Sequence, residues 1–418
     1  MHKLYVHFGA GNIGRSLAGA LFSQAGYDVL FVDAAPELVQ ALHERRRYRV
    51  VVKDVLPPGA PDSYWVERVD AISARDAEAV ADAVARADVI GTAVGAQVLP
   101  LVLRSAAPGL ARRTTPVSIL FCENLHGAAA LARRELTAAL PPGFPLAERI
   151  GLVETSIGKM VPLMPAGVRE RDPLEVWCEA YNRIIADRAG FVGPIPDVPG
   201  LELKGCFAAY VERKLYVHNL GHATCACHGF LKGYAQIWEA MADPAVAAET
   251  RAVMDETARA LIRRYSDEFD AAGQHAHVED LLRRFGNRAL GDTVFRVGRD
   301  LPRKLAPGDR FIGGLRLVAE VGGDLQPLCR AVAAALQFRA TDEAGQPFAA
   351  DVAFLDRIAT EGAPAVLAAH CGLDADLIAQ IAALAKPRRG CLQAECSGVR
   401  FRVSGRTTRC CVFLKPET

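Results

Sequence analysis

Short apolar runs alternate with amphipathic, alanine-rich stretches along the first part of the chain. The pattern predicts strands at residues 4–8, 28–32, 87–94 and 117–121 and helices at residues 13–25, 36–46 and 77–85. Strands that alternate with helices in this way form βαβ units, whose strands run parallel. We therefore predict an α/β domain with a doubly wound parallel sheet. We expect the run at 150–153 to extend this sheet and the segment 173–181 to form a strand on an added lobe.

The pattern changes after residue 193. The segment PIPDVPG at 194–200 holds three prolines and one glycine, which disfavour a regular helix and mark a connector. Beyond it, apolar residues recur at helical spacing in the segments 207–236, 244–265, 278–285 and 325–338. We predict three parts, namely the α/β domain with its added lobe at 1–195, a mainly α-helical domain at 196–385 and a tail at 386–418.

The tail is basic, with eight Lys or Arg against two Glu. The spacing of its four cysteines matches no zinc site, so a loose or strand-forming extension is a simpler interpretation than a metal or nucleic-acid site; they are Cys391, Cys396, Cys410 and Cys411. The whole chain carries 49 Lys and Arg against 48 Asp and Glu. It therefore lacks the global basic field that would hold nucleic acid or an anionic membrane.

The cysteines and the N-terminus bear on the cellular compartment. Eleven cysteines, an odd number at irregular spacings, indicate reduced thiols. The opening MHKLYVHFGAG shows no signal-peptide pattern, and the chain has no apolar run of about 18 residues that would span a membrane. We expect a cytoplasmic protein, present as a monomer or homodimer, that binds neither nucleic acid nor membrane.

A glycine-rich hexad follows the first predicted strand. Gly9-Ala10-Gly11-Asn12-Ile13-Gly14 has the form GxGxxG at a strand-to-helix junction. Gly9 permits the tight turn, Gly11 leaves room for a pyrophosphate, and Gly14 lets the helix pack close to the strand. The free N–H groups of the helix N-terminus favour an anion. The hexad predicts a dinucleotide site in a Rossmann domain.

Asp33 ends the second predicted strand, nineteen residues past Gly14. A carboxylate there accepts hydrogen bonds from both ribose hydroxyls and repels a 2′-phosphate, which favours NAD over NADP. Thr92, Val94 and Gly95 end another strand, at the sheet edge where ligands of open α/β folds bind. The alternatives are a Rossmann turn that binds no dinucleotide, with Asp33 as a helix N-cap, and an ordinary turn at 92–95.

A candidate catalytic face lies in the helical part, in VERKLYVHNLGH at 211–222. At about 100° per residue, Lys214, Asn219 and His222 fall within one arc of an α-helix. A lysine buried beside a nicotinamide has a lowered pKa and acts as a general base on a hydroxyl. Asn219 donates an amide N–H to the reacting oxygen, and His222 suits a substrate hydroxyl. This chemistry needs no metal; the alternative is a solvated lysine, a structural asparagine and a satisfied histidine.

Several blocks of sequence resemble a known family. FVGPIPDVPGLELKG, AAYVERKLYVHNLGHA and VGRDLPRKLAPGDRF, together with HFGAGNIGR, TAVG and CENLHG, resemble the polyol-specific long-chain dehydrogenases, most closely the mannitol-1-phosphate 5-dehydrogenases. The resemblance spans about residues 3–385. It implies a helical second domain, NAD-dependent and metal-independent catalysis, and the roles given above for Lys214, Asn219 and His222.

The same resemblance adds three residues. It implies that Asn124 is a second amide on the reacting oxygen, whereas a strand-ending, helix-capping asparagine is the alternative. It also implies that Arg296 and Lys304 bind the substrate. With Arg299 and Arg303 they form a basic cluster that suits a phosphate, although Arg299 and Arg303 also fit a solvated turn.

One segment departs from the family pattern. Family members typically read VDRIVP where this chain has Ile157-Gly158-Lys159-Met160-Val161-Pro162, so Gly158 replaces an aspartate and Lys159 an arginine. The loss removes a hydroxyl acceptor and a charge that tunes Lys214. A different polyol, a sugar acid or reduced turnover are all compatible with it.

Two other groups of residues are assigned no role. In Cys225-Ala226-Cys227-His228 the thiols are expected to pack in a core, since the spacing suits no metal site. His275 and His277 lie in an expected loop or helix start, where solvated imidazoles are the norm.

We therefore predict an NAD-dependent secondary-alcohol dehydrogenase that interconverts a polyol, such as mannitol 1-phosphate, and a ketose, such as fructose 6-phosphate. The alternatives are a hexuronate reductase acting on fructuronate or tagaturonate, and a non-catalytic NAD-responsive binding protein.

Overall fold

A mixed eight-stranded sheet forms the N-terminal half of the protein. The computed structural model describes residues 2–162, 164 and 166–385, so the predicted tail with its four cysteines lies outside the described residues. The strand order is β11-β10-β8-β7-β6-β1-β2-β5. Six neighbouring strands of this order, from β8 through to β5 at the sheet edge, run parallel. They are β1 (Leu4–Phe8), β2 (Asp28–Asp33), β5 (Val69–Ser73), β6 (Val89–Thr92), β7 (Val117–Phe121) and β8 (Ile150–Ile157). The predicted doubly wound parallel sheet is confirmed, and residues 150–153 extend it.

Two strands that the sequence pattern did not reveal continue the sheet. β10 (Ile184–Asp187) is antiparallel to β8, and β11 (Leu201–Lys204) is parallel to β10. A separate three-stranded sheet, β4-β3-β9, is the added lobe. It comprises β3 (Tyr48–Val52), β4 (Ser63–Val66) and β9 (Val176–Cys178), so the predicted strand at 173–181 is confirmed in a shorter form.

Helices cover both faces of the large sheet, because consecutive strand residues point to opposite faces. Val6 of β1 packs in one core with α3 (Ala77–Arg86), α4 (Leu99–Ala111) and α5 (Ala128–Ala139). Tyr5 packs in a second core with α1 (Ala20–Gln24), which continues the π-helix η1 (Gly14–Gly19), and with the added lobe. The remaining elements of this half are α2 (Pro36–Arg45), α6 (Leu146–Arg149), α7 (Ala166–Arg171) and η2 (Arg188–Gly190).

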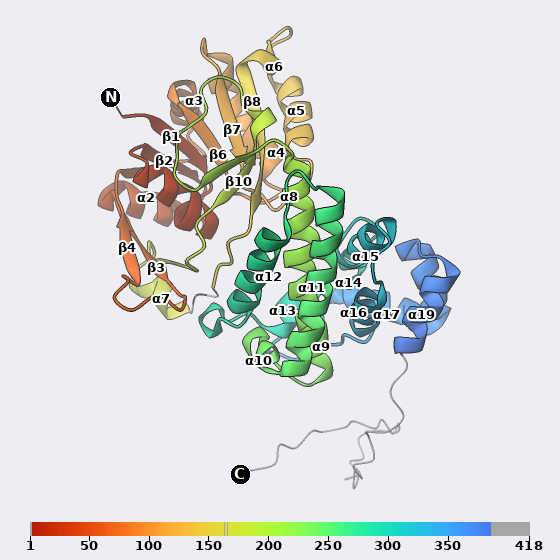
Figure 1. Cartoon of the computed structure of the whole chain (residues 1–418). Helices are drawn as coiled ribbons and strands as arrows, with labels where there is room; N and C mark the ends of the chain where they lie inside the picture. The colour runs from red at the N-terminus through yellow and green to blue at the C-terminus, as the bar shows by residue number, and fades with distance from the viewer. Residues whose placement is uncertain (1, 163, 165, 386–418) are drawn as a thin grey trace, which may run out of the picture.

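The second half is helical and has its own apolar core. Its long helices α9 and α11 lie side by side (Figure 1). They pack closely because residue 221 is glycine: a Cβ there would lie 2.5 Å from the Met254 sulfur. The elements are α8 (Phe207–Arg213), η3 (Lys214–Asn219), α9 (Leu220–Leu231), α10 (Ile237–Ala242), α11 (Pro244–Arg264), α12 (Ala271–Phe285), η4 (Arg288–Leu290), α13 (Val294–Gly298), α14 (Leu301–Lys304), α15 (Arg310–Glu320), α16 (Gln326–Ala335), α17 (Ala349–Glu361), α18 (Ala363–Val366), η5 (Leu367–Cys371) and α19 (Ala375–Ala385).

Two helices end or begin at residues other than those predicted from the sequence. The helix predicted at 207–236 stops at Leu231, and Gly233 follows with a φ of +83°, a conformation that ends helices. The helix predicted at 278–285 begins at Ala271, because the Asp270 side chain accepts a hydrogen bond from the Gly273 N–H at 2.7 Å and caps it.

Candidate active site

The glycine hexad forms the turn between β1 and η1. Gly9 has a φ of +93°, and a Cβ on Gly14 would lie 2.0 Å from the Gly9 carbonyl oxygen, so both positions require glycine. A Cβ on Gly11 would meet no protein atom within 4 Å. The space beside Gly11 is thus not filled by the protein. This geometry fits a dinucleotide pyrophosphate at the start of the helix.

Asp33 lies beside this turn. Its carboxylate oxygens accept hydrogen bonds from the Ala10 N–H at 2.7 Å and the Ala35 N–H at 2.9 Å. These two bonds leave lone pairs on both oxygens, since each carboxylate oxygen has two. The carboxylate is thereby held at the end of β2, beside the hexad.

Glu123 holds the loop at 92–95, a role that sequence reasoning missed. Its carboxylate accepts hydrogen bonds from the Val94 N–H at 2.9 Å and the Gly95 N–H at 2.7 Å. The hydroxyl of Thr92 is buried without a hydrogen-bond partner among the described residues. Glu123 therefore fixes the backbone of a loop at the carboxyl edge of the sheet, while Asn124, the next residue, faces the helical domain.

The helix that carries Lys214 is not a regular α-helix. Residues Lys214–Asn219 form a π-helix between α8 and α9. In a π-helix the bonded residues are five apart, so Lys214 and Asn219 lie nearly one above the other. The predicted 100° spacing is therefore wrong for this segment, although its conclusion holds for this pair, since both residues line the same cavity.

Lys214 of the helical half contacts Asn124 of the Rossmann half. The Lys214 ammonium donates a hydrogen bond to Asn124 Oδ1 at 3.3 Å. The two residues and Asn219 line a cavity of about 400 Å³ together with Glu154 and Ser156 of β8. Burial, and secondarily the positive charge of Arg310, lower the pKa of Lys214 from 10.5 to about 8. The site thus holds an amine that changes protonation state near neutral pH beside two amides.

His222 lies one turn further along, on α9, and is not among the described residues that line this cavity. Its ring stacks on Phe285 at 4.6 Å, and its Nε2 is 3.7 Å from the Asp292 carboxylate. Burial lowers its pKa to about 4 even though Asp292 raises it, so the imidazole is neutral at pH 7. A neutral imidazole can donate and accept hydrogen bonds, which suits a hydroxyl group.

Two of the four cations in the predicted basic cluster are paired with aspartates of the same domain. Arg296 pairs with Asp292, and Arg303 pairs with Asp300 and Asp309. Lys304 is buried, donates to the Arg299 carbonyl oxygen, and has a pKa lowered to about 8 by burial and by Arg310. The Arg299 guanidinium lies over the rings of Phe295 and Phe348.

Arg310 connects these groups electrostatically, and sequence reasoning missed it. It begins α15, is largely buried and bonds to Asp309 at 2.8 Å. Its positive charge lowers the pKa values of Lys214, His222 and Lys304 together. These three side chains come from different helices and share Arg310 as an electrostatic neighbour.

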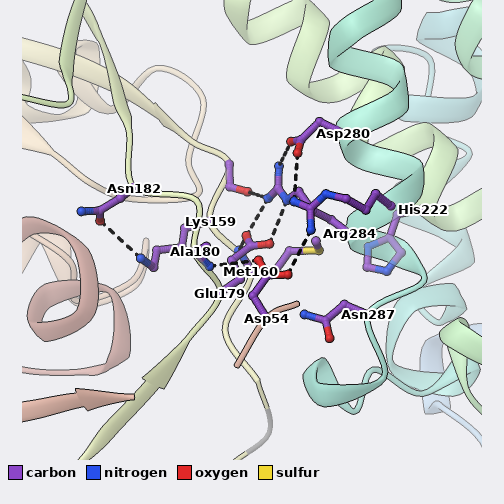
Figure 2. A network of polar contacts seen from close by, with 12 residues as sticks. Asp54, Lys159, Met160, Glu179, Ala180, Asn182, His222, Asp280, Arg284 and Asn287 are labelled. Atoms are coloured by element: carbon purple, nitrogen blue, oxygen red, sulfur yellow. Dashed lines mark hydrogen bonds and ion pairs between the residues drawn. The ribbon is translucent and has the colours of Figure 1, made fainter. Parts of the chain in front are cut away.

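The segment that departs from the family pattern lies at the junction of the two halves. Arg284 of α12 binds both oxygens of Glu179 and the Gly158 carbonyl oxygen, and it extends between Glu179 and Asp280 (Figure 2). Arg284 and Glu179 are both buried, at 2% and 0% side-chain exposure. Lys159 points away from Arg284 and donates to Asn182 at 3.3 Å (Figure 2).

The prediction for His277 is wrong, whereas that for His275 is confirmed. Both lie on α12, where His275 is exposed, with 70% of its side chain accessible. His277 faces the opposite way, and its Nε2 is buried. Burial, with Arg213 and Arg284, lowers its pKa to about 3. Cys225 and Cys227 pack in the helical core as predicted.

Comparison with known proteins identifies the family. The mannitol dehydrogenase Rossmann domain matches residues 3–200, and the mannitol dehydrogenase C-terminal domain matches residues 207–380. The chain belongs to the mannitol dehydrogenase family. It is thus an NAD-dependent polyol dehydrogenase, as the sequence predicted.

Two solved structures share the fold of this mannitol dehydrogenase family member. A D-sorbitol dehydrogenase in substrate-free form superposes with a TM-score of 0.76 and 17% identity, covering 92% of this chain and 93% of that chain. The mannitol 2-dehydrogenase of Pseudomonas fluorescens, in a ternary complex with NAD and D-mannitol, gives a TM-score of 0.69 and 18% identity, covering 92% and 91%. At these identities the likeness concerns the fold.

Two features are absent from the part of this family member that the structure describes. Within the described residues, no helix is both long and apolar enough to cross a membrane. The same part of the chain contains no cluster of three or more His, Cys, Asp or Glu side chains suited to a metal ion.

Proposed function

We propose that this enzyme interconverts mannitol 1-phosphate, a polyol phosphate, and fructose 6-phosphate, a ketose phosphate, with NAD as the redox partner. One observation carries the proposal: the partly desolvated Lys214 amine lies 3.3 Å from Asn124 in a cavity that Asn219 also lines. An alcohol oxidation without a metal needs a base for the hydroxyl proton and donors for the oxygen, and this group supplies both.

Each residue has a distinct role in the proposed reaction. The neutral Lys214 amine accepts the hydroxyl proton during oxidation, and its ammonium returns that proton during reduction. Asn124 accepts from Lys214 through Oδ1, which leaves its amide N–H groups for the substrate oxygen, where Asn219 donates as well. His222, Arg296 and Lys304 position the hydroxyl-bearing chain.

The hexad residues Gly9 to Gly14 would hold NAD, with Asp33 at the ribose and Thr92, Val94 and Gly95 along the carboxyl edge of the sheet. NAD, when bound, accepts the hydride from the alcohol carbon in oxidation and supplies it in reduction. The Gly11 space and the two free lone pairs of Asp33 support this assignment.

We also propose a cytoplasmic location. The seven cysteines of the described residues are free thiols, as a reducing compartment favours. The oligomeric state, monomer or homodimer, stays a prediction.

The test is a panel of substrates whose turnover is measured as the change in NADH absorbance. Mannitol 1-phosphate and mannitol are offered with NAD, and fructose 6-phosphate, fructuronate and tagaturonate with NADH. The proposal expects the highest kcat/KM with the phosphorylated pair. Higher kcat/KM with fructuronate or tagaturonate would support the hexuronate reductase, and turnover of none of them would refute dehydrogenase activity on these sugars.

A further inference from the structure

A second cavity adjoins the catalytic one. It is partly open to solvent, contains about 330 Å³ of empty space, and shares Ser156 and Lys214 with the first cavity. Arg213, His277 and Arg284 contribute to its wall, and no carboxylate occurs among the described residues that line it. A substrate whose reacting carbon lies at Lys214 can therefore extend one end into a cationic compartment.

Two polar groups of this wall lack partners. The Arg213 guanidinium makes neither a hydrogen bond nor an ion pair with any described residue, and it lies over the rings of Tyr210 at 4.8 Å and Phe269 at 5.1 Å. The buried His277 Nε2 also has no hydrogen-bond partner in the described part of the chain. Buried polar groups are nearly always hydrogen-bonded, so the buried His277 Nε2 indicates a missing ligand, and the half-buried Arg213 cation lies in the same wall.

Arg284 has a different role. Its guanidinium binds both oxygens of Glu179 and the Gly158 carbonyl, so its charge is compensated within the protein. It supports the Tyr181 ring, which lies 4.6 Å from the guanidinium carbon. The nearby acid Glu202 is likewise paired, with Arg183 and Lys204. Arg213 and the general-base candidate Lys214 are the wall cations that no described carboxylate within ion-pair distance compensates.

Gly158 keeps this compartment open and free of negative charge. A Cβ at this position would be 3.5 Å from the Tyr181 ring, an ordinary contact, so the site has room for a side chain. An aspartate there would place a carboxylate in the wall. The glycine therefore removes a group that would repel an anion.

We infer that Arg213, with His277, binds the anionic end group of the substrate, a phosphate or a carboxylate, in the cavity beside Lys214. The inference rests on the proposed function and names the residues that recognise the charge. The planar guanidinium offers two parallel N–H donors to the oxygens, and His277 offers a third. The predicted cluster around Arg296 is a weaker candidate because its arginines Arg296 and Arg303 are already paired with aspartates.

The first experiment compares charged and neutral ketoses. In the Arg213→Leu variant, KM for fructose 6-phosphate should rise roughly 10- to 100-fold, while KM for fructose stays unchanged. Arg303→Leu, which removes an exposed cation of the other cluster, should alter neither value. Fructuronate distinguishes a carboxylate from a phosphate as the preferred anion. Equal losses for charged and neutral ketoses, or a selective loss in Arg303→Leu, would overturn the inference.

The second experiment uses an isosteric pair at Gly158. Gly158→Asp should raise KM for fructose 6-phosphate far more than Gly158→Asn, because only the aspartate adds a charge. KM for fructose, which carries no charge, should be alike in the two variants. Equal effects of the two variants on fructose 6-phosphate would contradict the inference.

A binding measurement separates this inference from the proposed function. Inorganic phosphate is titrated into the wild-type enzyme and the Arg213→Leu variant, and the heat of binding is recorded. Binding to the wild type that Arg213→Leu abolishes supports the anion site even if every ketose in the panel proves inactive. Binding of equal strength to both, or to neither, refutes it, whatever the turnover shows.

Discussion

The two halves of the active site are built from different parts of the chain. On the Rossmann side, the backbone forms most of the site, beside the Asp33 carboxylate: it supplies glycine turns, N–H groups at the start of a helix, and a loop whose amides Glu123 holds. On the helical side, side chains form it, and burial changes their ionisation, as for Lys214 and His222.

This difference assigns different tasks to the two sides. Backbone groups do not titrate, so the cofactor side should bind with little dependence on pH. The helical side should carry the proton transfer and its pH dependence. Substitutions on one side should therefore leave the function of the other intact.

The largest effect is expected at Lys214. Lys214→Met removes the proposed base, so kcat should fall by roughly 10³-fold or more in both directions, while the dissociation constant of NADH, measured by fluorescence, stays unchanged. Lys232→Met, a substitution of an exposed lysine just past the end of α9, is the matched control and should retain activity. A loss of NADH affinity in Lys214→Met would show that the helical side also binds the cofactor, contrary to the proposed separation of tasks.

The amides should have the next largest effect. Asn219→Ala and Asn124→Ala each remove a donor to the reacting oxygen, so kcat should fall by roughly 10²-fold with a smaller change in KM. Steady-state kinetics of ketose reduction give both values. A change confined to KM would mean that these residues bind the ground state and do not stabilise the transition state.

A smaller effect is expected on the cofactor side. Asp33→Asn weakens the hydrogen bonds to the ribose, so KM for NAD should rise roughly 10-fold, and the discrimination against NADP should decrease. The pH dependence of kcat should not move. Glu37→Gln, a change at an exposed carboxylate on α2, serves as the control. If Asp33→Asn shifts the pH profile, the cofactor side does take part in proton transfer.

The smallest effect concerns Arg310. Because the pKa of Lys214 is about 8, polyol oxidation should increase as pH rises through about 8, and ketose reduction should decrease. Arg310→Leu removes a positive charge that disfavours the ammonium, so the pKa of Lys214 should rise and both profiles should move to higher pH. The measurement is kcat/KM against pH. The control variant Arg357→Leu, at an exposed position, should leave the pH profile unchanged. A shift as large as that of Arg310→Leu would mean that Arg310 does not act on Lys214 through its proximity.

Local sequence was sufficient to predict the strands and turns of the cofactor side, but not the contact between Glu123 and the loop at 92–95. The glycine hexad, Asp33 and the loop at 92–95 follow strands whose apolar pattern is visible, and a parallel sheet brings the carboxyl ends of its strands to one edge. The short strands Ser63–Val66 and Ile184–Asp187 escaped prediction because four residues give too brief an alternation.

On the helical side, the contacts and burial of the side chains depend on tertiary structure and could not be predicted from local sequence. The partnership of Lys214 with Asn124 joins residues 90 positions apart, and the resemblance, not the spacing, pointed to it. Arg213, His277 and Arg310 gain their roles only from the packing of α8, α12 and α15, and the charged sequence around them resembles any solvated helix. The exposure of His277 was predicted wrongly because Asp270 caps α12 and the helix begins at Ala271, before the predicted start at residue 278. His277 therefore lies within the helix, on a face that packs against the rest of the protein.

The π-helix at Lys214–Asn219 has a consequence for how this chain tolerates change in length. A π-helical turn is equivalent to an α-helix with one residue inserted. Deleting one residue between Lys214 and Asn219 would restore the α-helical period and leave these two residues four positions apart, still on one face. The helix downstream would keep its register, so Gly221 would stay against Met254. The π-helical turn should therefore accept the loss of one position more readily than the α-helical turns on either side of it.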